Sequence, residues 1–446
     1  MAQTLIPTVE KRSGVRALVV AALGFFVLTL DTQIVTVAMP VIGHELHGGI
    51  NALQWVATGY TLMLAALLLS AGSMSDRLGA SRTVEIGLIA FTLASAAGGL
   101  APGLGVLIGA RFVQGAAAAA ILPASLSLVR QAFPDTAART RAIASWTAAG
   151  GAAMAAGPLV GGLLTSTLGW RWVFFVNVPI GIVGLVLLAR MPRSLPRRVP
   201  FDLPGQISVV VAVAAVTYAV IQGGRAGLVA LAVFVAAAVF FVVSQSRSAH
   251  PMVPPQLFRS AAVTVTTATG MALNFGFYGV VFLMALYFEQ LRGLSSLVTG
   301  LMFLPMTALI TVVNLLAGRL TGRYGPRLPM LVGQALLFAG MLGLLALDVG
   351  SSFWLQVVVL LPFGLGGGLA VPALTAALMG SVDADRAGMA SGVLNAGRQF
   401  GGALGVAVFG TLAAGDFIAG LHLSAVLGAV LLVITGTVTT IFLRPR

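Results

Sequence analysis

An acidic residue in the middle of an apolar stretch is the most unusual chemical feature of this sequence. Residues 17–42 read ALVVAALGFFVLTLDTQIVTVAMPVI, and Asp31 is their one charged residue. A carboxylate at the centre of a membrane-spanning helix costs at least about 2.5–3.5 kcal/mol on insertion scales, so it is a functional candidate. Water and cations change the proton affinity of a carboxylate, so Asp31 could exchange a proton or contact a substrate. A permanent Asp–Arg strut between helices is the alternative.

The composition indicates which class of protein holds this acid. Of the 446 residues, 58% are hydrophobic and only 8% are charged, whereas a soluble domain is roughly 25% charged. So few charges cannot cover a water-exposed surface, and the sequence therefore predicts a polytopic membrane protein. The lack of cysteine excludes disulfides and thiolate chemistry. The first apolar stretch is expected to stay as a transmembrane helix, because no small-residue cleavage site follows it.

The apolar stretches predict an all-α fold with fourteen transmembrane helices, arranged as six, two and six. Each stretch has about the length that a bilayer requires. They are residues 17–42, 52–73, 84–102, 104–129, 142–167, 171–190, 204–222, 226–244, 260–287, 297–318, 329–347, 353–379, 388–412 and 421–442. Asp31 is the only acid well inside a span. The other acids lie in loops or near helix ends, namely Glu10, Glu45, Asp76, Glu85, Asp135, Asp202, Glu289, Asp348, Asp383, Asp385 and Asp416.

The basic residues predict the orientation. With both termini in the cytoplasm, the outer segments hold only Arg171, Arg225 and Arg292, and the spans hold Arg111 and Arg398. All other Lys and Arg residues then fall in cytoplasmic segments, as the positive-inside rule requires. This distribution accounts for the net charge of +13 without a nucleic-acid partner. The expected partners are the lipid bilayer, protons and a small-molecule substrate, and the chain is expected to be a monomer.

Arg111 is the expected partner of Asp31. The helix that carries Asp31 runs outward, and the helix that carries Arg111 runs inward. At about 1.5 Å per residue, Asp31 lies roughly 16 Å from the outer end of its helix and Arg111 roughly 10 Å from that of its own. An arginine can reach across the difference of roughly 6 Å, and an unpaired guanidinium at this depth would be costly. Pairing alone would not show transport.

Arg398 lies near the middle of the span 388–412 and has no obvious acid in its own half of the chain. A charge at this depth is expected to face a bundle interior or a water-filled cavity. Two interpretations are open. Arg398 could contact a ligand in a hydrated cavity, or it could have a structural role and bind backbone carbonyls.

A repeated loop indicates an internal duplication. GSMSDRLG begins at Gly72 after the second span, and GRLTGRYG begins at Gly318 after the tenth. Each loop joins the second and third helices of a six-helix half, although short Arg/Gly loops could also be similar by chance. We expect an N-terminal half over residues 1–191, a linker with two inserted helices over 192–257, and a C-terminal half over 258–446. Duplicated halves around a central site are typical of secondary transporters.

Five motifs resemble those of the major facilitator superfamily, specifically its fourteen-helix drug–proton antiporter branch, and the resemblance covers nearly the whole chain. The motifs are LDTQIVTVAMP at 30–40, GSMSDRLGASR at 72–82, LxxxRxxQG at 107–115, GPxxGG at 157–162 and WRWVFFVNVPIG at 170–181. Three departures stand out. Thr36 replaces an asparagine, Ala80 and Ser81 replace basic residues, and Ala153 replaces a glycine.

The resemblance implies roles for several residues. It assigns Arg111 to proton coupling, and it assigns the first repeated loop to a cytoplasmic latch that stabilises the outward-open state. Asp76 in this loop is expected to cap a helix start or to pair with a nearby arginine. Gly322 takes its place in the second half, so the latch is asymmetric. The expected latch residues are Gly72, Asp76, Arg77, Gly79 and Arg82.

Gly157, Pro158, Gly161 and Gly162 place small residues and a helix breaker in one span. Small residues let two helix backbones approach closely, and proline removes one i→i−4 hydrogen bond. We therefore expect a tight, bendable contact between the two halves that blocks leakage.

Polar and aromatic residues within the spans are candidates for a substrate cavity. Each could instead be a packing or interface residue, so the prediction concerns the set. No metal site is expected, because HELH at 44–47 lacks the H-E-x-x-H spacing, and no nucleophile–base pair suggests an enzyme. The candidates are Thr32, Gln33, Thr36, Trp55, Tyr60, Asn274, Tyr278, Asn314, Asn395 and Arg398.

These observations and the resemblance predict a proton-coupled efflux transporter of the bacterial cytoplasmic membrane. It would export lipophilic drug-like or antibiotic molecules by alternating access, with no cofactor other than the proton gradient. Asp31 would exchange one proton per cycle, tuned by Arg111. A nutrient or metabolite symporter on the same scaffold is the first alternative, which the Gly-Pro motif disfavours. A membrane receptor or assembly factor is the second, and it predicts no effect of removing charges within the spans.

Overall fold

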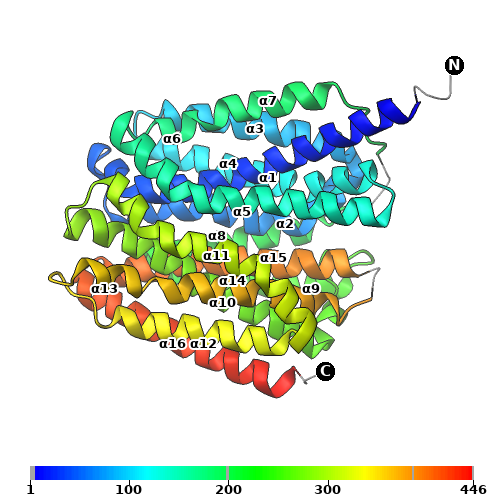
Figure 1. Ribbon diagram of the computed structural model, residues 1–446. Helices are drawn as coiled ribbons and strands as arrows, with labels where there is room; N and C mark the ends of the chain where they lie inside the picture. The colour runs from blue at the N-terminus through cyan, green and yellow to red at the C-terminus, as the bar shows by residue number, and fades with distance from the viewer. Residues whose placement is uncertain (1–5, 197–199, 384–385, 444–446) are drawn as a thin grey trace.

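The computed structural model describes residues 6–196, 200–383 and 386–443, and this part of the chain is helical without strands (Figure 1). The first group of helices is α1 (Ile6–Glu45), α2 (Ile50–Leu78), α3 (Ala80–Gly99), α4 (Leu104–Ala132), α5 (Thr136–Thr167), α6 (Trp172–Phe175) and α7 (Asn177–Ala189). The second is α8 (Leu203–Gln222) and α9 (Gly224–Arg247). The third is η1 (Pro255–Arg259), α10 (Ala261–Leu286), η2 (Tyr287–Leu291), α11 (Ser296–Tyr324), α12 (Arg327–Leu344), α13 (Phe353–Val358), α14 (Leu361–Met379), α15 (Ala387–Ala413) and α16 (Phe417–Phe442).

Every predicted span overlaps a helix or an interrupted helix, such as α6 with α7 or α13 with α14. Within the described residues, twelve helical units are long and apolar enough to cross a bilayer. The other two are α3, which carries Arg82 and Glu85 near its start, and α15, which carries Asn395, Arg398 and Gln399. Both pack among the other helices, α3 against α4 and α15 against α10 and α2. The count of fourteen therefore depends on these two polar helices.

The helices lie roughly parallel in two bundles, α1 to α7 and α10 to α16 (Figure 1). The start of α1 and the end of α16 lie at the same end of the molecule, which the distribution of arginine assigns to the cytoplasm (Figure 1). Helix α8 contacts both α2 and α15, one helix from each bundle. Helix α9 has only 6% of its span buried, so it presents nearly all of its apolar surface outward.

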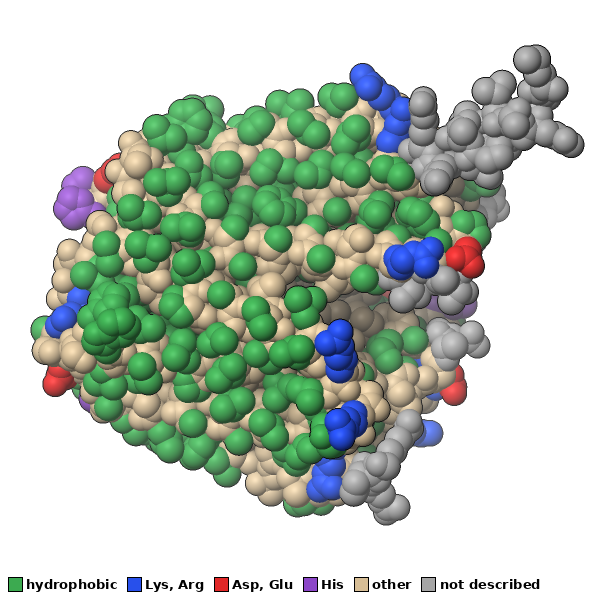
Figure 2. Space-filling model, viewed as in Figure 1, with side chains coloured by type: hydrophobic (Ala, Val, Ile, Leu, Met, Phe, Trp, Pro, Cys, Tyr) green, Lys and Arg blue, Asp and Glu red, His purple; other side chains and the backbone are tan. Residues whose placement is uncertain are grey.

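The outer surface of the bundle is apolar. Hydrophobic side chains cover the face shown in Figure 2, and charged side chains gather toward its two ends. This pattern matches a band of lipid contact between two aqueous surfaces.

The two bundles meet tightly on the outer side. In α2, the Gln54 side chain donates a hydrogen bond of 2.6 Å to the backbone oxygen of Ala407 in α15. Between α5 and α11, a Cβ atom at Gly162 would clash with the backbone oxygen of Ser296, and one at Gly300 would clash with that of Pro158. These contacts lie in the outer halves of the four helices, so the structure is closed toward the outside.

The bundles are less tightly joined at the cytoplasmic end. A Cβ atom at Gly72, Gly318 or Gly322 would meet no heavy atom within 4 Å, so neither repeated loop is packed closely at these positions. A hollow is visible on the face shown in Figure 2, toward the end at which α1 begins. The structure is therefore an inward-facing arrangement.

Candidate functional site

Asp31 of α1 and Arg111 of α4 form a buried ion pair. Their exposed fractions are 0% and 1%, and Nη1 of Arg111 donates a short hydrogen bond to Oδ2 of Asp31. Two other ion pairs, Arg171–Glu45 and Arg193–Glu85, are largely exposed. The contact predicted from the depth of the two residues in the membrane is thus present.

Arg111 is held by further hydrogen bonds. Its Nε donates to the backbone oxygen of Val56 over 3.1 Å, and its Nη1 donates to Oε1 of Gln114 over 3.0 Å. The guanidinium carbon lies 4.6 Å from the centre of the Tyr60 ring, which is within cation–π range. The amide of Gln114 in turn donates to Oδ1 of Asp31 over 3.0 Å.

Asn177 and Ser95 complete the polar network. Nδ2 of Asn177 donates to Oδ1 of Asp31 over 2.8 Å and to Oγ of Ser95 over 3.0 Å. Gln114 also donates to Ser95, over 3.3 Å. Asp31 therefore accepts hydrogen bonds from one guanidinium and two amides, which is the environment that an ionised carboxylate requires in a buried position.

Close helix packing and one helix interruption position these groups. A Cβ atom at Gly115 would clash with the backbone of Tyr60, so the glycine lets α4 approach α2 and brings Arg111 against Val56. The break between α6 and α7 places Asn177 at the start of α7. It also leaves the backbone oxygen of Phe174 to accept a hydrogen bond of 2.8 Å from the Ser95 hydroxyl.

A small cavity lies where the two bundles meet, beside the ion pair. Its volume is about 20 Å³, which is enough for a water molecule and far too small for a drug-sized ligand. Arg111 is part of the wall, whereas Asp31 lies behind it. A molecule in this cavity would therefore meet Arg111 before Asp31. The lining residues are Thr32, Val35, Thr36, Met39, Ala57, Thr61, Arg111, Tyr278, Val281, Phe282, Gly402 and Val406.

Several candidate cavity residues of the N-terminal bundle lie elsewhere. Thr32, Thr36 and Tyr278 line the cavity, but Gln33 is buried against Gly157 of α5. Trp55 packs its ring near those of Phe112 and Tyr218, at centroid distances of 6.1 and 6.2 Å. Tyr60 is buried beside the guanidinium of Arg111. In this conformation Gln33 and Trp55 therefore contribute to contacts between helices, and Tyr60 contacts the ion pair.

The candidates of the C-terminal bundle are also dispersed. Asn274 is buried on α10, and Asn314 on α11 is exposed. Asn395 donates to the backbone oxygen of Ser391, one turn earlier in its own helix, over 3.0 Å. Arg398 is half-buried, and its Nε has no hydrogen-bond partner among the described residues.

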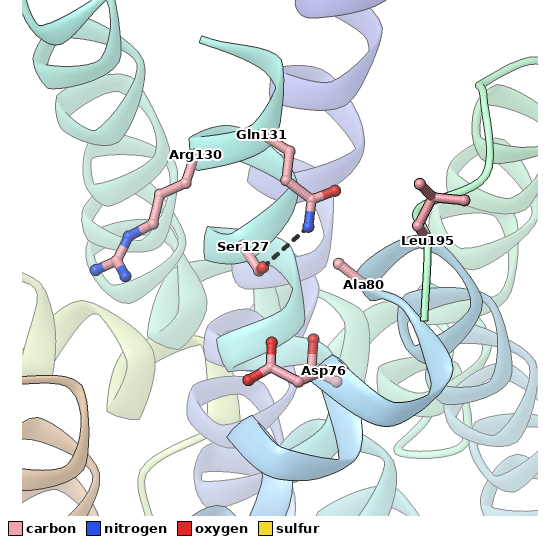
Figure 3. Close-up of a pocket in the computed structure, with 7 residues that line it drawn as sticks. Asp76, Ala80, Ser127, Arg130, Gln131 and Leu195 are labelled. Carbon is pink, nitrogen blue, oxygen red and sulfur yellow. Dashed lines mark hydrogen bonds between the residues drawn. The ribbon is translucent and has the colours of Figure 1, made fainter. Parts of the chain in front are cut away.

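The first repeated loop borders a second cavity at the cytoplasmic end, with a volume of about 200 Å³ (Figure 3). Asp76 lies on one side of this cavity, and Ser127, Arg130 and Gln131 of α4 also line it. The prediction that Asp76 caps a helix or pairs with an arginine is wrong for this conformation. Gly79 is the N-cap of α3, and Asp76 makes no ion pair within the described ranges.

The backbone turns at Gly79, between the end of α2, which carries Asp76, and the start of α3. Gly79 has a φ of 86°, and a Cβ there would clash with the backbone oxygen of Ser194. Only glycine fits both conditions without strain. Arg77 places the central carbon of its guanidinium 5.9 Å from the centre of the Phe201 ring, while Arg82 is exposed.

The Gly-Pro motif of α5 packs on two partners. Gly157 and Gly161 face α1, where a Cβ at Gly161 would lie 2.8 Å from the Cα of Ile34. Pro158 and Gly162 face α11 across the seam between the bundles. The predicted close packing between halves is present, and the motif also joins α5 to α1 within its own half.

Replacing Gly162 with valine is expected to hold the outer seam open, because the new side chain would clash with the backbone of Ser296. The chain has no cysteine, so Thr36→Cys in the cavity wall can report access from outside. We expect Gly162→Val to raise labelling by an impermeant maleimide several-fold. Gly109→Val on α4, where a Cβ meets no atom within 4 Å, is the matched control. Equal labelling of the two variants would contradict the seam.

Three residues of the polar network were absent from the predicted site: Ser95, Gln114 and Asn177. Gln114 lies within the motif at 107–115, and Asn177 lies within the motif at 170–181. Gln114 also lies three positions after Arg111, on the same face of a helix. Their polar type within apolar spans was a usable signal. Ser95 had no comparable signal, because small hydroxyl residues are common in such helices.

Comparison with known proteins shows the family of this chain. A model described as Major Facilitator Superfamily matches residues 21–406. The multidrug resistance protein Stp of Mycobacterium tuberculosis is 40% identical over 414 residues, which cover 90% of this chain and 76% of that protein. The methylenomycin A resistance protein of Streptomyces coelicolor is 36% identical over 407 residues, with coverage of 90% and 86%.

The crystal structure of the human organic anion transporter MFSD10 is similar in fold. The TM-score is 0.66 at 15% sequence identity, and the match covers 96% of this chain and 99% of that one. Two helical bundles around a central cavity, the matched family model and the two relatives lead to the same conclusion. The chain belongs to the Major Facilitator Superfamily.

Proposed function

We propose that this protein is a proton-coupled exporter of drug-like or antibiotic molecules in the cytoplasmic membrane of a bacterium. The observation that carries the proposal is the buried Asp31–Arg111 pair behind the wall of a cavity between two bundles. The names of the relatives, which are resistance proteins of bacteria, support the direction and the substrate class. We take residues 1–191 and 258–446 as the moving halves, with 192–257 beside them.

The ion pair supplies a proton switch in this proposal. In the inward-facing state Asp31 is ionised and bound to Arg111, and a substrate enters from the cytoplasm. After the protein turns outward, a proton from outside neutralises Asp31. Neutral Asp31 binds Arg111 less strongly, because the charge-assisted hydrogen bond is lost. The freed guanidinium changes the cavity wall, and substrate leaves. Return to the inward state releases the proton to the cytoplasm.

The network suggests one proton per cycle, because Asp31 is the only acid deep within a span. Asn177 and Gln114 keep their hydrogen bonds to the carboxyl group in either protonation state, if the proton binds Oδ2. They would thus hold Asp31 in place while Arg111 moves. All of these groups belong to a single chain, and we propose that the transporter works as a monomer.

Transport into everted membrane vesicles tests the proposal. A proton gradient directed outward, acidic inside the vesicle, is expected to drive uptake of a drug, and a protonophore is expected to stop it. The symporter alternative predicts that this gradient drives drug out of the vesicle instead. A receptor or assembly factor predicts no proton-dependent flux in either direction.

A further inference from the structure

Arg398 is a cation near the middle of a span with no partner in the described part of the chain. It forms none of the ion pairs found there, and its Nε is buried without a hydrogen bond. Arg111, by contrast, donates hydrogen bonds to Val56, Asp31 and Gln114. An unpaired charge within a membrane protein is expected to mark a ligand path or a hydrated cavity. Arg398 therefore has free N–H donors to offer to a ligand.

The position of Arg398 places it at the cytoplasmic approach to the central cavity. Arg398 precedes Gly402 by one helical turn, so the two share a face of α15, and Gly402 lines the cavity. Side chains on a helix lean toward its N-terminus, which for α15 is the cytoplasmic end. Tyr278 lies beside the same face of α15, since a Cβ at Gly402 would lie 2.8 Å from its ring.

The neighbouring helix α10 has a glycine, Gly270, at the point where the side chain of Arg398 packs against it. A Cβ atom at Gly270 of α10 would lie 2.9 Å from Cγ of Arg398. The missing side chain at Gly270 therefore provides the space in which the stem of Arg398 packs. The stem of Arg398 is thus held against α10.

The charges around the cavity leave a net positive site. Asp31 is fully buried and neutralises Arg111, so the pair adds no net charge. The other acids in the membrane-spanning helical units lie near helix ends, Glu45 and Glu289 on the outer side and Asp76 on the cytoplasmic side. Glu289 accepts a hydrogen bond of 3.0 Å from Ser296. In the described part of the chain, no acid forms an ion pair with Arg398 to offset its charge.

The geometry points to an anionic substrate whose carboxylate binds Arg398, an inference that deepens the proposed function and rests on it. A guanidinium offers two parallel N–H donors to a carboxylate. In a conformation with a wider cavity, the apolar residues of its wall would contact the rest of a lipophilic molecule. A cationic drug would be repelled. Export of a monoanion in exchange for a proton moves two charges in the favourable direction across an inside-negative membrane.

Binding of three pyrene probes to the purified protein in nanodiscs tests this inference. Pyrenebutyrate, its amide and a pyrenylbutyl trimethylammonium share one apolar skeleton and differ in charge. Because hydrogen bonds to charged groups are the stronger ones, we expect the carboxylate to bind at least about tenfold more tightly than the amide. Arg398→Gln should remove this preference, and Arg398→Lys should keep part of it.

Arg171→Gln, at an exposed outer arginine, is the control and should keep the full preference. Equal affinity for the three probes, no binding of the carboxylate, or an unchanged preference in Arg398→Gln would overturn the role of Arg398. Proton-driven transport by the Asp31→Asn variant reports on the proposed function separately. A failure of either proposal is therefore distinguishable from a failure of the other.

Discussion

Replacing Asp31 with asparagine is expected to abolish export driven by a proton gradient while substrate exchange continues. Asparagine keeps the shape of the side chain and a carbonyl oxygen that can accept from Asn177 and Gln114, but it cannot carry a proton. Proton-driven drug uptake into everted vesicles should fall to the level of empty membranes. Counterflow, in which labelled drug exchanges for unlabelled drug without a gradient, should remain measurable and shows that the variant is folded.

Glu45→Gln is the matched control for this variant. Glu45 is an exposed carboxylate at the outer end of the same helix, where it pairs with Arg171. Its neutralisation should leave proton-driven uptake near the wild-type rate, because exposed ion pairs contribute little. Full proton-driven uptake by Asp31→Asn would exclude Asp31 as the coupling residue.

Replacing Arg111 with methionine is expected to destabilise the protein and to stop transport. The change leaves Asp31 buried with two amide donors and no cation. Removing one partner of a buried ion pair typically costs about 3–5 kcal/mol. The melting temperature in detergent should fall clearly below that of the wild type, and proton-driven uptake should be lost.

The double variant Asp31→Asn with Arg111→Met separates stability from coupling. With both charges removed, no unpaired charge stays buried, and replacing a buried pair by uncharged groups is often neutral or stabilising. The melting temperature should return toward the wild-type value, whereas proton-driven uptake should stay absent. A double variant as unstable as Arg111→Met alone would show that the loss does not come from the unpaired Asp31.

The sequence was sufficient to predict the helices and the central pair because both follow from simple physical rules. A bilayer sets the length of each span, and the fixed rise of a helix gives the depth of Asp31 and Arg111. Two oppositely charged residues at similar depths are expected to pair, because an unpaired charge within the membrane is costly. The same logic identified Arg398 as a charge without an acid in its own half.

Side-chain direction was not predictable in the same way. Helices such as α1, α2 and α10 are apolar on most of their surface, so no polar face indicates which side meets a neighbour. Gln33 and Trp55 were therefore included in the cavity, although the structure places them against α5 and near α4 and α8. Asn177 depends on the break between α6 and α7, which a count of apolar residues does not reveal.

Substrate-driven proton movement in proteoliposomes tests the central claim most directly. Liposomes carry a pH dye inside, start without a proton gradient, and receive a drug gradient directed outward. The proposal predicts that drug leaving the vesicle draws protons in, so the interior becomes acidic with wild-type protein and stays unchanged with Asp31→Asn. Drug flux without any pH change, or alkalinisation because protons leave together with the drug, would contradict proton antiport.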